Sequence, residues 1–262
     1  MDLNLEGRKA LVVASSSGLG KAIAAQLVEE GADVMLTSRS EEKLKQTCEE
    51  LRQLGRGRVE YTVADITDRA GIESLFARMS EVYGDRIDIM LCNSGGPPAK
   101  RFEELDEEEW EKAFQLNLLS YVRLIKNALP FMKEHGGHIL NLTSSSVKQP
   151  IPGLILSNTF RLGVAGMTKT LSAELAGYGI LINTIAPGRI ATDRITQLNS
   201  IHADKLGVSL EEFAKHNQEE IPLGRYGTPE EFAKAAVFLL SGANSYVTGS
   251  ILVVDGGLVQ SL

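Results

Sequence analysis

The sequence predicts an α/β protein with a doubly wound sheet, and two observations support this. Short, nearly continuous apolar runs alternate with longer helical patterns along all 262 residues. No linker, internal repeat or low-complexity tract interrupts the alternation. Apolar strands separated by helices are typical of a parallel sheet that is covered on both faces. We therefore expect residues 1–262 to form a single Rossmann-type domain with a seven-stranded, mainly parallel sheet.

The elements can be assigned in order from the pattern. The expected strands are residues 9–14, 33–37, 58–65, 87–93, 137–143, 180–186 and 250–256. The first helix follows the first strand and ends at Gly31, and the later helices are expected at about 40–54, 68–83, 106–134, 157–177 and 229–240. The polar stretch at about 193–222 reads as an irregular insertion just past a strand. We expect it to act as a lid over a small-molecule substrate.

Composition excludes several classes of partner. The net charge of −7 argues against a nucleic-acid surface, which needs a concentrated basic face. The sequence contains no apolar run of 18 or more residues, so no membrane span is predicted. The first residues do not resemble an export signal. Cys48 and Cys92 stand far apart in unrelated contexts. We therefore expect a reduced, cytoplasmic protein without a metal site.

A glycine-containing turn follows the first strand. The stretch ASSSGLG (14–20) leads directly into a helix, where free N–H groups can face phosphates. Gly18 and Gly20 would let a pyrophosphate approach the backbone closely. The alternative is a tight strand-to-helix turn that binds no ligand. The predicted cofactor-binding residues of this turn are Ala14, Ser16, Ser17, Gly18, Leu19 and Gly20.

The end of the second strand bears on the choice of cofactor. Sites for NAD usually place a carboxylate here for the ribose hydroxyls. This chain has Ser38 followed by Arg39, whose guanidinium could pair with a 2′-phosphate. The pattern favours NADP(H) over NAD(H). The alternative is a solvated arginine at the start of a helix.

These features, together with others further along, resemble the short-chain dehydrogenase/reductase family, and within it the 3-oxoacyl-acyl-carrier-protein reductases. The likeness extends over nearly the whole chain. Its landmarks occur in the family's order: the turn at 14–20, VAD ending at Asp65, CNSGG (92–96), Asn117 in QLNLLS, NLT followed by Ser144, APGRIATD (186–193) and VTGSILVVDGG (247–257).

The resemblance implies roles for several residues. Asp65 would lie near the adenine, Ser144 would hydrogen-bond a substrate carbonyl, and Asn117 would hold a water in a proton relay. The implied contacts to the cofactor's ribose and nicotinamide come from Asn93, Gly95, Pro187, Gly188, Ile190 and Thr192. The resemblance also implies a homodimer or homotetramer.

The chain departs from the family at the catalytic pair. The family places Tyr-x-x-x-Lys thirteen residues after the serine, where this chain has Ser157 and Arg161. A phenol has a pKa near ~10 that neighbours can lower, whereas an aliphatic hydroxyl is a far weaker acid. Arg161 lies one helical turn from Ser157 and could keep the positive charge. A second departure is Ala14, which replaces the first glycine of the turn.

Three functions remain open from the sequence. The first is a reductase with altered proton delivery, for which Lys148 is a candidate donor, although a solvated loop lysine is the simpler interpretation of this residue. Tyr121 is more simply a packed residue. The second is a nucleotide-binding protein with little or no redox activity. The third is a different reaction on the same scaffold, as in halohydrin dehalogenases, which the retained Gly18, Gly20 and Asp65 disfavour.

Overall fold

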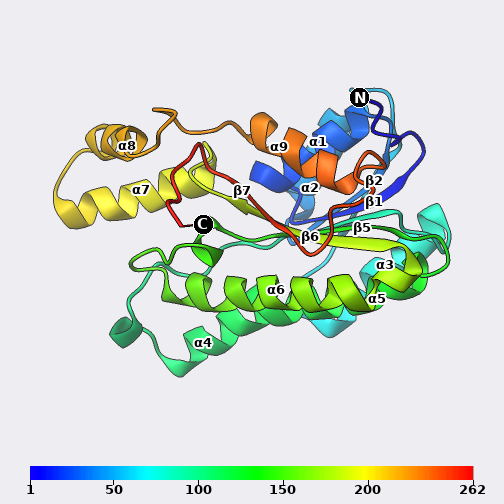
Figure 1. Ribbon diagram of the computed structural model, residues 1–262, viewed down its shortest axis with the longest axis horizontal. Coiled ribbons are helices and arrows are strands. Elements are labelled where there is room, and N and C mark those ends of the chain that lie inside the picture. Colours follow the sequence, from blue (N-terminus) through cyan, green and yellow to red (C-terminus); the bar gives the residue numbers. More distant parts are fainter. Residues whose placement is uncertain (262) are drawn as a thin grey trace.

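The computed structural model describes residues 1–261, apart from the side chain of Lys205, and forms three layers with the sheet in the middle (Figure 1). The strands of the sheet lie in the order β3-β2-β1-β4-β5-β6-β7, and every neighbouring pair is parallel. The doubly wound sheet predicted from the sequence is therefore confirmed. The strands are β1 (Lys9–Val13), β2 (Asp33–Ser38), β3 (Val59–Val63), β4 (Ile89–Cys92), β5 (Gly137–Leu142), β6 (Ile180–Pro187) and β7 (Ile251–Val254).

Helices cover both faces of the sheet, each burying apolar residues against it. One face packs against α1 (Gly18–Glu29), α2 (Glu41–Arg52) and α9 (Pro229–Leu240). The opposite face packs against α3 (Arg69–Tyr83), α5 (Ser120–Met132) and α6 (Ile155–Glu174). The helix α4 (Glu107–Phe114) lies outside α6 (Figure 1). No helix in the described part of the chain is long and apolar enough to cross a membrane.

The order of the strands locates the site. The chain winds in one direction through β1, β2 and β3, and in the other through β4 to β7. Ligands of such sheets bind at the carboxyl ends of the strands, where the winding reverses. The segments that follow β1 and β4 meet at this point, so the glycine turn and CNSGG lie side by side, joined by a hydrogen bond from Asn93 to the carbonyl of Ala14.

Two elements differ from the sequence prediction. The helix expected at 106–134 is interrupted by a π-helical turn at Gln115–Leu119, which separates α4 from α5. The segment expected to be irregular at 193–222 forms two helices, α7 (Asp193–Leu206) and α8 (Leu210–Glu219). Gly207, with a φ of 69°, ends α7, and Ser209 caps α8. The polar composition of this segment led to the prediction of a loop. The segment is polar because its helices have a solvent-facing side, while residues on their other side line a cavity.

Candidate active site

A cavity of about 990 Å³ lies at the carboxyl edge of the sheet. Its walls come from the segments after β1, β2, β3, β4, β5 and β6, and from α6, α7 and α8. Most residues predicted from the sequence meet here: Ala14, Ser16, Ser17, Gly18, Leu19, Arg39, Asp65, Asn93, Gly95, Ser144, Ser157, Arg161, Pro187, Gly188, Ile190 and Thr192. Gly20, Asn117 and Lys148 do not line it.

The turn after β1 is shaped to hold a nucleotide. A Cβ placed on Gly20 would lie 2.3 Å from the carbonyl oxygen of Ala14, so only glycine lets the start of α1 approach the strand end this closely. Gly18 lines the cavity with a φ of 56°, a conformation that glycine adopts without strain. The N-terminus of α1 therefore opens into the cavity, where it can bind phosphate oxygens.

Arg39 and Asp65, which the sequence predicts to bind the cofactor, line the same cavity as the glycine turn. Arg39 is exposed, lines the cavity and has no ion pair with any described residue. Asp65 lines the same region and accepts hydrogen bonds from the backbone N–H and the hydroxyl of Thr67, at 2.9 and 2.7 Å. These residues and the glycine turn therefore lie together on the cavity wall, as a dinucleotide site requires.

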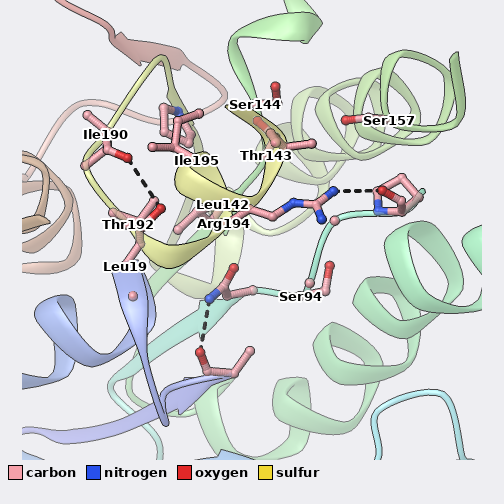
Figure 2. Close-up of a pocket in the computed structure, with 18 of the residues that line it drawn as sticks. Leu19, Ser94, Leu142, Thr143, Ser144, Ser157, Ile190, Thr192, Arg194 and Ile195 are labelled. Atoms are coloured by element: carbon pink, nitrogen blue, oxygen red, sulfur yellow. Dashed lines mark hydrogen bonds between the residues drawn. The ribbon is translucent and has the colours of Figure 1, made fainter. Parts of the chain in front are cut away.

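The stretch SNTFR (157–161) lies on α6, and its side chains do three different things. Ser157 is 8% exposed and lines the cavity, and in Figure 2 its hydroxyl points from α6 toward the loop that carries Ser144. Asn158 holds the neighbouring loop, because its amide exchanges two hydrogen bonds with the backbone of Ile151. Phe160 packs on Trp110, with ring centroids 5.8 Å apart.

Arg161 is the buried cation of the site. Its side chain is 4% exposed, and Nη1 donates to the hydroxyl of Tyr121 at 2.7 Å and to the carbonyl of Leu142 at 2.8 Å. Nη2 donates to the carbonyl of Ser94 at 3.4 Å. No carboxylate of the described residues pairs with Arg161, so its partners are all neutral. The guanidinium joins the end of β5 to the loop after β4, at the wall of the cavity.

Tyr121 supports Arg161 and does not reach the cavity. Burial raises the pKa of its phenol, and the positive charge of Arg161 offsets this only in part. The hydroxyl donates to the carbonyl of Leu142 at 2.8 Å, so it remains a neutral hydrogen-bonding group. The prediction that Tyr121 is a packed residue is confirmed, since it is fully buried. Its part in positioning Arg161 was missed, although it lies one helical turn from Asn117.

Asn117 lies in the π-helical turn, completely buried. Its amide nitrogen donates to the hydroxyl of Ser94 at 3.0 Å and to the carbonyl of Gly95 at 2.7 Å. Its side-chain oxygen has no protein partner among the described residues. Turns of this kind are frequent at functional sites, and this one aims the Asn117 side chain at the loop after β4.

Ser144 and Lys148 occupy the loop after β5. The hydroxyl of Ser144 accepts a hydrogen bond from the backbone N–H of Ser146 at 3.2 Å and lines the cavity. Lys148 is exposed and does not line the cavity. Ser144, Ser157 and Arg161 thus line one cavity, and Lys148 lies outside it. The hypothesis that Lys148 donates a proton stays a prediction, and no contact among the described residues supports it.

Arg194, which is not among the residues predicted from the sequence, also lines the cavity. It stands at the start of α7 and donates from Nη2 to the carbonyl of Pro97 at 2.9 Å (Figure 2). A signal was available, since Arg194 directly follows the family landmark APGRIATD. No group of three or more potential metal ligands occurs among the residues that the structure describes.

Comparison with known proteins agrees with this geometry. Residues 13–259 match the family model described as enoyl-(acyl carrier protein) reductase. The chain is 35% identical to the 3-oxoacyl-acyl-carrier-protein reductase FabG of Thermotoga maritima, over 98% of this chain and 100% of that protein. It is 32% identical to the uncharacterized oxidoreductase YvrD of Bacillus subtilis, over 100% of both chains.

Solved structures give the same result. The L-sorbose reductase of Gluconobacter frateurii, complexed with NADPH and L-sorbose, superposes over 100% of both chains with a TM-score of 0.95 and 28% identity. A variant of the actinorhodin polyketide ketoreductase with NADPH reaches 0.92 and 33% identity, over 97% of this chain and 98% of that one. The chain therefore belongs to the short-chain dehydrogenase/reductase family of NAD(P)-dependent oxidoreductases and is similar to 3-oxoacyl-acyl-carrier-protein reductases.

Proposed function

We propose that the protein is an NADP(H)-dependent oxidoreductase that interconverts a carbonyl and an alcohol on a small-molecule substrate. The observation that carries this is the meeting of the nucleotide cradle with Ser144, Ser157 and Arg161 in one cavity. Bound NADP(H) would supply the hydride chemistry. The cradle residues would hold its phosphates, and the unpaired Arg39 would select its 2′-phosphate.

Proton delivery is altered in this proposal, because Ser157 and Arg161 stand where the family has tyrosine and lysine. The hydroxyls of Ser144 and Ser157 would donate hydrogen bonds to the substrate oxygen and orient it. The charge of Arg161, buried with neutral partners only, would stabilise negative charge on that oxygen. A serine hydroxyl does not release a proton near neutral pH, so the proton must reach the oxygen from solvent or another group.

Two titrations and one turnover assay test the proposal. Fluorescence titration should show saturable binding of NADPH at least about tenfold tighter than of NADH, with Arg39→Asp reversing this preference. NADPH oxidation should then be measured against a panel of aldehydes, ketones and oxo acids. We expect turnover by the wild type, and faster turnover by the Ser157→Tyr/Arg161→Lys double variant, which restores an acidic phenol beside a cation.

The outcomes separate the competing functions. Absence of binding to either nucleotide would exclude the cofactor assignment. NADPH binding without turnover in the wild type, but with turnover in the double variant, would favour a nucleotide-binding protein with little redox activity. An unchanged kcat across the pH range in Lys148→Met would exclude Lys148 as the donor.

We also propose that the chain self-associates as a homodimer or homotetramer. Apolar side chains on the outer helices support this, since Leu162 of α6 is 55% exposed and Phe114 of α4 is 38% exposed. Burying such residues between subunits would remove apolar surface from water. Sedimentation velocity measures the oligomeric state directly.

A further inference from the structure

We propose that Arg194 recognises a carboxylate on the substrate, so that the protein acts on oxo acids or hydroxy acids. This inference rests on the proposed function, because it names the substrate class of the same cavity. Its evidence is a partly buried guanidinium that lines the cavity, has neutral partners only, and shares the cavity with a second arginine, Arg161.

Arg194 has donors to spare. Nη2 donates to the carbonyl of Pro97 at 2.9 Å, and Nη1 donates to the side-chain oxygen of Gln197 at 3.2 Å. A guanidinium carries five N–H donors. Within the described part of the chain, its remaining donors have no partner, and no carboxylate pairs with it. A planar fork with unused donors suits the two oxygens of a carboxylate.

The positive charges of Arg194 and Arg161 favour the binding of an anionic ligand. Burial lowers the pKa of its guanidinium, and the positive charge of Arg161 lowers it further. Arg161 itself is buried against neutral oxygens only. Arg161 and Arg194 line the same cavity, and neither forms an ion pair with a carboxylate of the described residues, so their charges repel each other and lose hydration without compensation. A ligand anion would relieve both costs, so the cavity favours a charged substrate over a neutral one.

Gly96 makes room for the guanidinium. A Cβ built on Gly96 would lie 3.0 Å from Nη2 and 3.4 Å from Cζ of Arg194, so the head group rests directly on the Gly96 backbone. The φ of Gly96 is not in the left-handed region, so its backbone would accept a side chain without strain. A side chain at position 96 would therefore push the guanidinium of Arg194 out of this position, whereas the turn itself would tolerate one. Gly96 and Arg194 therefore act together, because the glycine leaves the space that the guanidinium occupies.

The position of this feature matches a substrate group. Arg194 extends from the start of α7 to the loop after β4, between the segments that carry Ser94 and Thr143 (Figure 2). Ser144 and Ser157, which are proposed to hold the reacting oxygen, line the same cavity. A substrate with a carbonyl and a carboxylate could therefore meet the serines and Arg194 together.

The test compares each acid with its uncharged amide. Wild-type protein and Arg194→Met are assayed with NADPH against acetoacetate and acetoacetamide, levulinate and its amide, and phenylglyoxylate and its amide. Calorimetry measures binding of the same compounds to protein without cofactor. We expect the wild type to prefer the acids by about 10- to 100-fold, and Arg194→Met to lose this preference. Arg194→Lys should restore part of it, because lysine keeps the charge but not the fork.

Two further variants sharpen the result. Gly96→Val leaves Arg194 in the sequence but fills the space of its head group, so it should reduce the acid-to-amide ratio as well. Arg69→Met removes an exposed arginine that does not line the cavity, and it should keep the wild-type ratio. A preference for acids that survives in Arg194→Met would overturn the proposal, as would equal binding of acids and amides by the wild type.

The two proposals fail in different ways. If no compound is oxidised or reduced but calorimetry shows the acid preference and its loss in Arg194→Met, the redox function fails and the anion site stands. If Arg194→Met weakens NADPH binding and leaves the acid-to-amide ratio unchanged, Arg194 contacts the phosphates of the cofactor, and the substrate proposal is wrong.

Discussion

Ala14 adopts a backbone conformation that L-residues avoid. Its φ is 52°, at a position where the family has glycine. The left-handed conformation costs a residue with a Cβ roughly 1–2 kcal/mol. The carbonyl of Ala14 is nonetheless held in place by Asn93 and by the close approach of Gly20. The surrounding contacts thus maintain the turn against the preference of the residue itself.

Replacing Ala14 with glycine should therefore stabilise the protein. We expect Ala14→Gly to raise the free energy of unfolding by about 0.5–1 kcal/mol, because the relief of strain exceeds the extra entropy of the unfolded chain. Urea denaturation measures this. The matched control is Ala22→Gly in the interior of α1, which should lower stability by about 1 kcal/mol. A loss of stability in Ala14→Gly would show that the turn is not strained.

At the scale of elements, α6 joins the chemistry of the site to the loop beside it. Ser157 and Arg161 face the cavity, while Asn158 fastens the loop at Ile151 to the start of the same helix. This loop supplies Gln149, Pro150, Ile151 and Pro152 to the cavity wall. Movement of the loop would therefore change the shape of the cavity without moving Ser157 or Arg161.

Removal of the Asn158 amide should loosen that loop. Asn158→Ala loses two hydrogen bonds to backbone groups, and we expect a loss of about 1–3 kcal/mol in unfolding free energy. Hydrogen exchange in residues 148–154 should accelerate more than exchange in the rest of α6. Thr159→Ala, an exposed neighbour on the same helix, serves as the control and should leave exchange unchanged. Equal exchange in both variants would mean that the loop is held by other contacts.

The sequence predicts these elements unequally well. The strands and the cradle were predictable, because apolar runs and glycines act locally on the chain. The interruption of the helix at Asn117 was not, since a π-helical turn depends on how α5 packs. Helices α7 and α8 were read as an irregular lid because their polar faces hide the helical period. The hydrogen bond between Arg161 and Tyr121 joins residues far apart in sequence, and no local pattern in either segment predicts it.

In the whole molecule, the cavity and a buried, hydrogen-bonded carboxylate that stabilises the fold lie at opposite edges of the sheet. The cavity occupies the carboxyl edge, whereas Asp88, just before β4, organises the other edge. Asp88 is 4% exposed and accepts hydrogen bonds from the backbone N–H of Lys9 and from the guanidinium groups of Arg8 and Arg86, at 2.7–3.0 Å. Burial alone would raise the pKa of Asp88, but these donors outweigh it and hold the pKa below its ordinary value.

This arrangement gives stability a defined dependence on pH. A carboxyl group with a lowered pKa in the folded state stabilises the protein fully above its unfolded pKa, about 3.9, and this contribution disappears as pH falls through the folded value. We expect Asp88→Asn to lose about 2–4 kcal/mol at pH 7. The difference from wild type should be constant from pH 6 to pH 8 and shrink below about pH 4.

Urea denaturation of both proteins across this range measures the effect. Asp85→Asn is the control, since Asp85 is an exposed neighbour on the same loop and has no arginine partner among the described residues. A difference between wild type and Asp88→Asn that grows on acidification would contradict the assignment. Cofactor binding at the opposite edge should change little in Asp88→Asn at pH 7.

The contact between Gly96 and Arg194 has a consequence for redesign. A Cβ at position 96 would lie 3.0 Å from Nη2 of Arg194, so a side chain there would displace the guanidinium and the effects of changes at the two positions are coupled. Grafting the arginine alone onto a relative with a bulky residue at the corresponding position would place its head group elsewhere. Transfer of the acid preference would require the glycine first and the arginine second, and in the reverse order the intermediate would carry a misplaced cation.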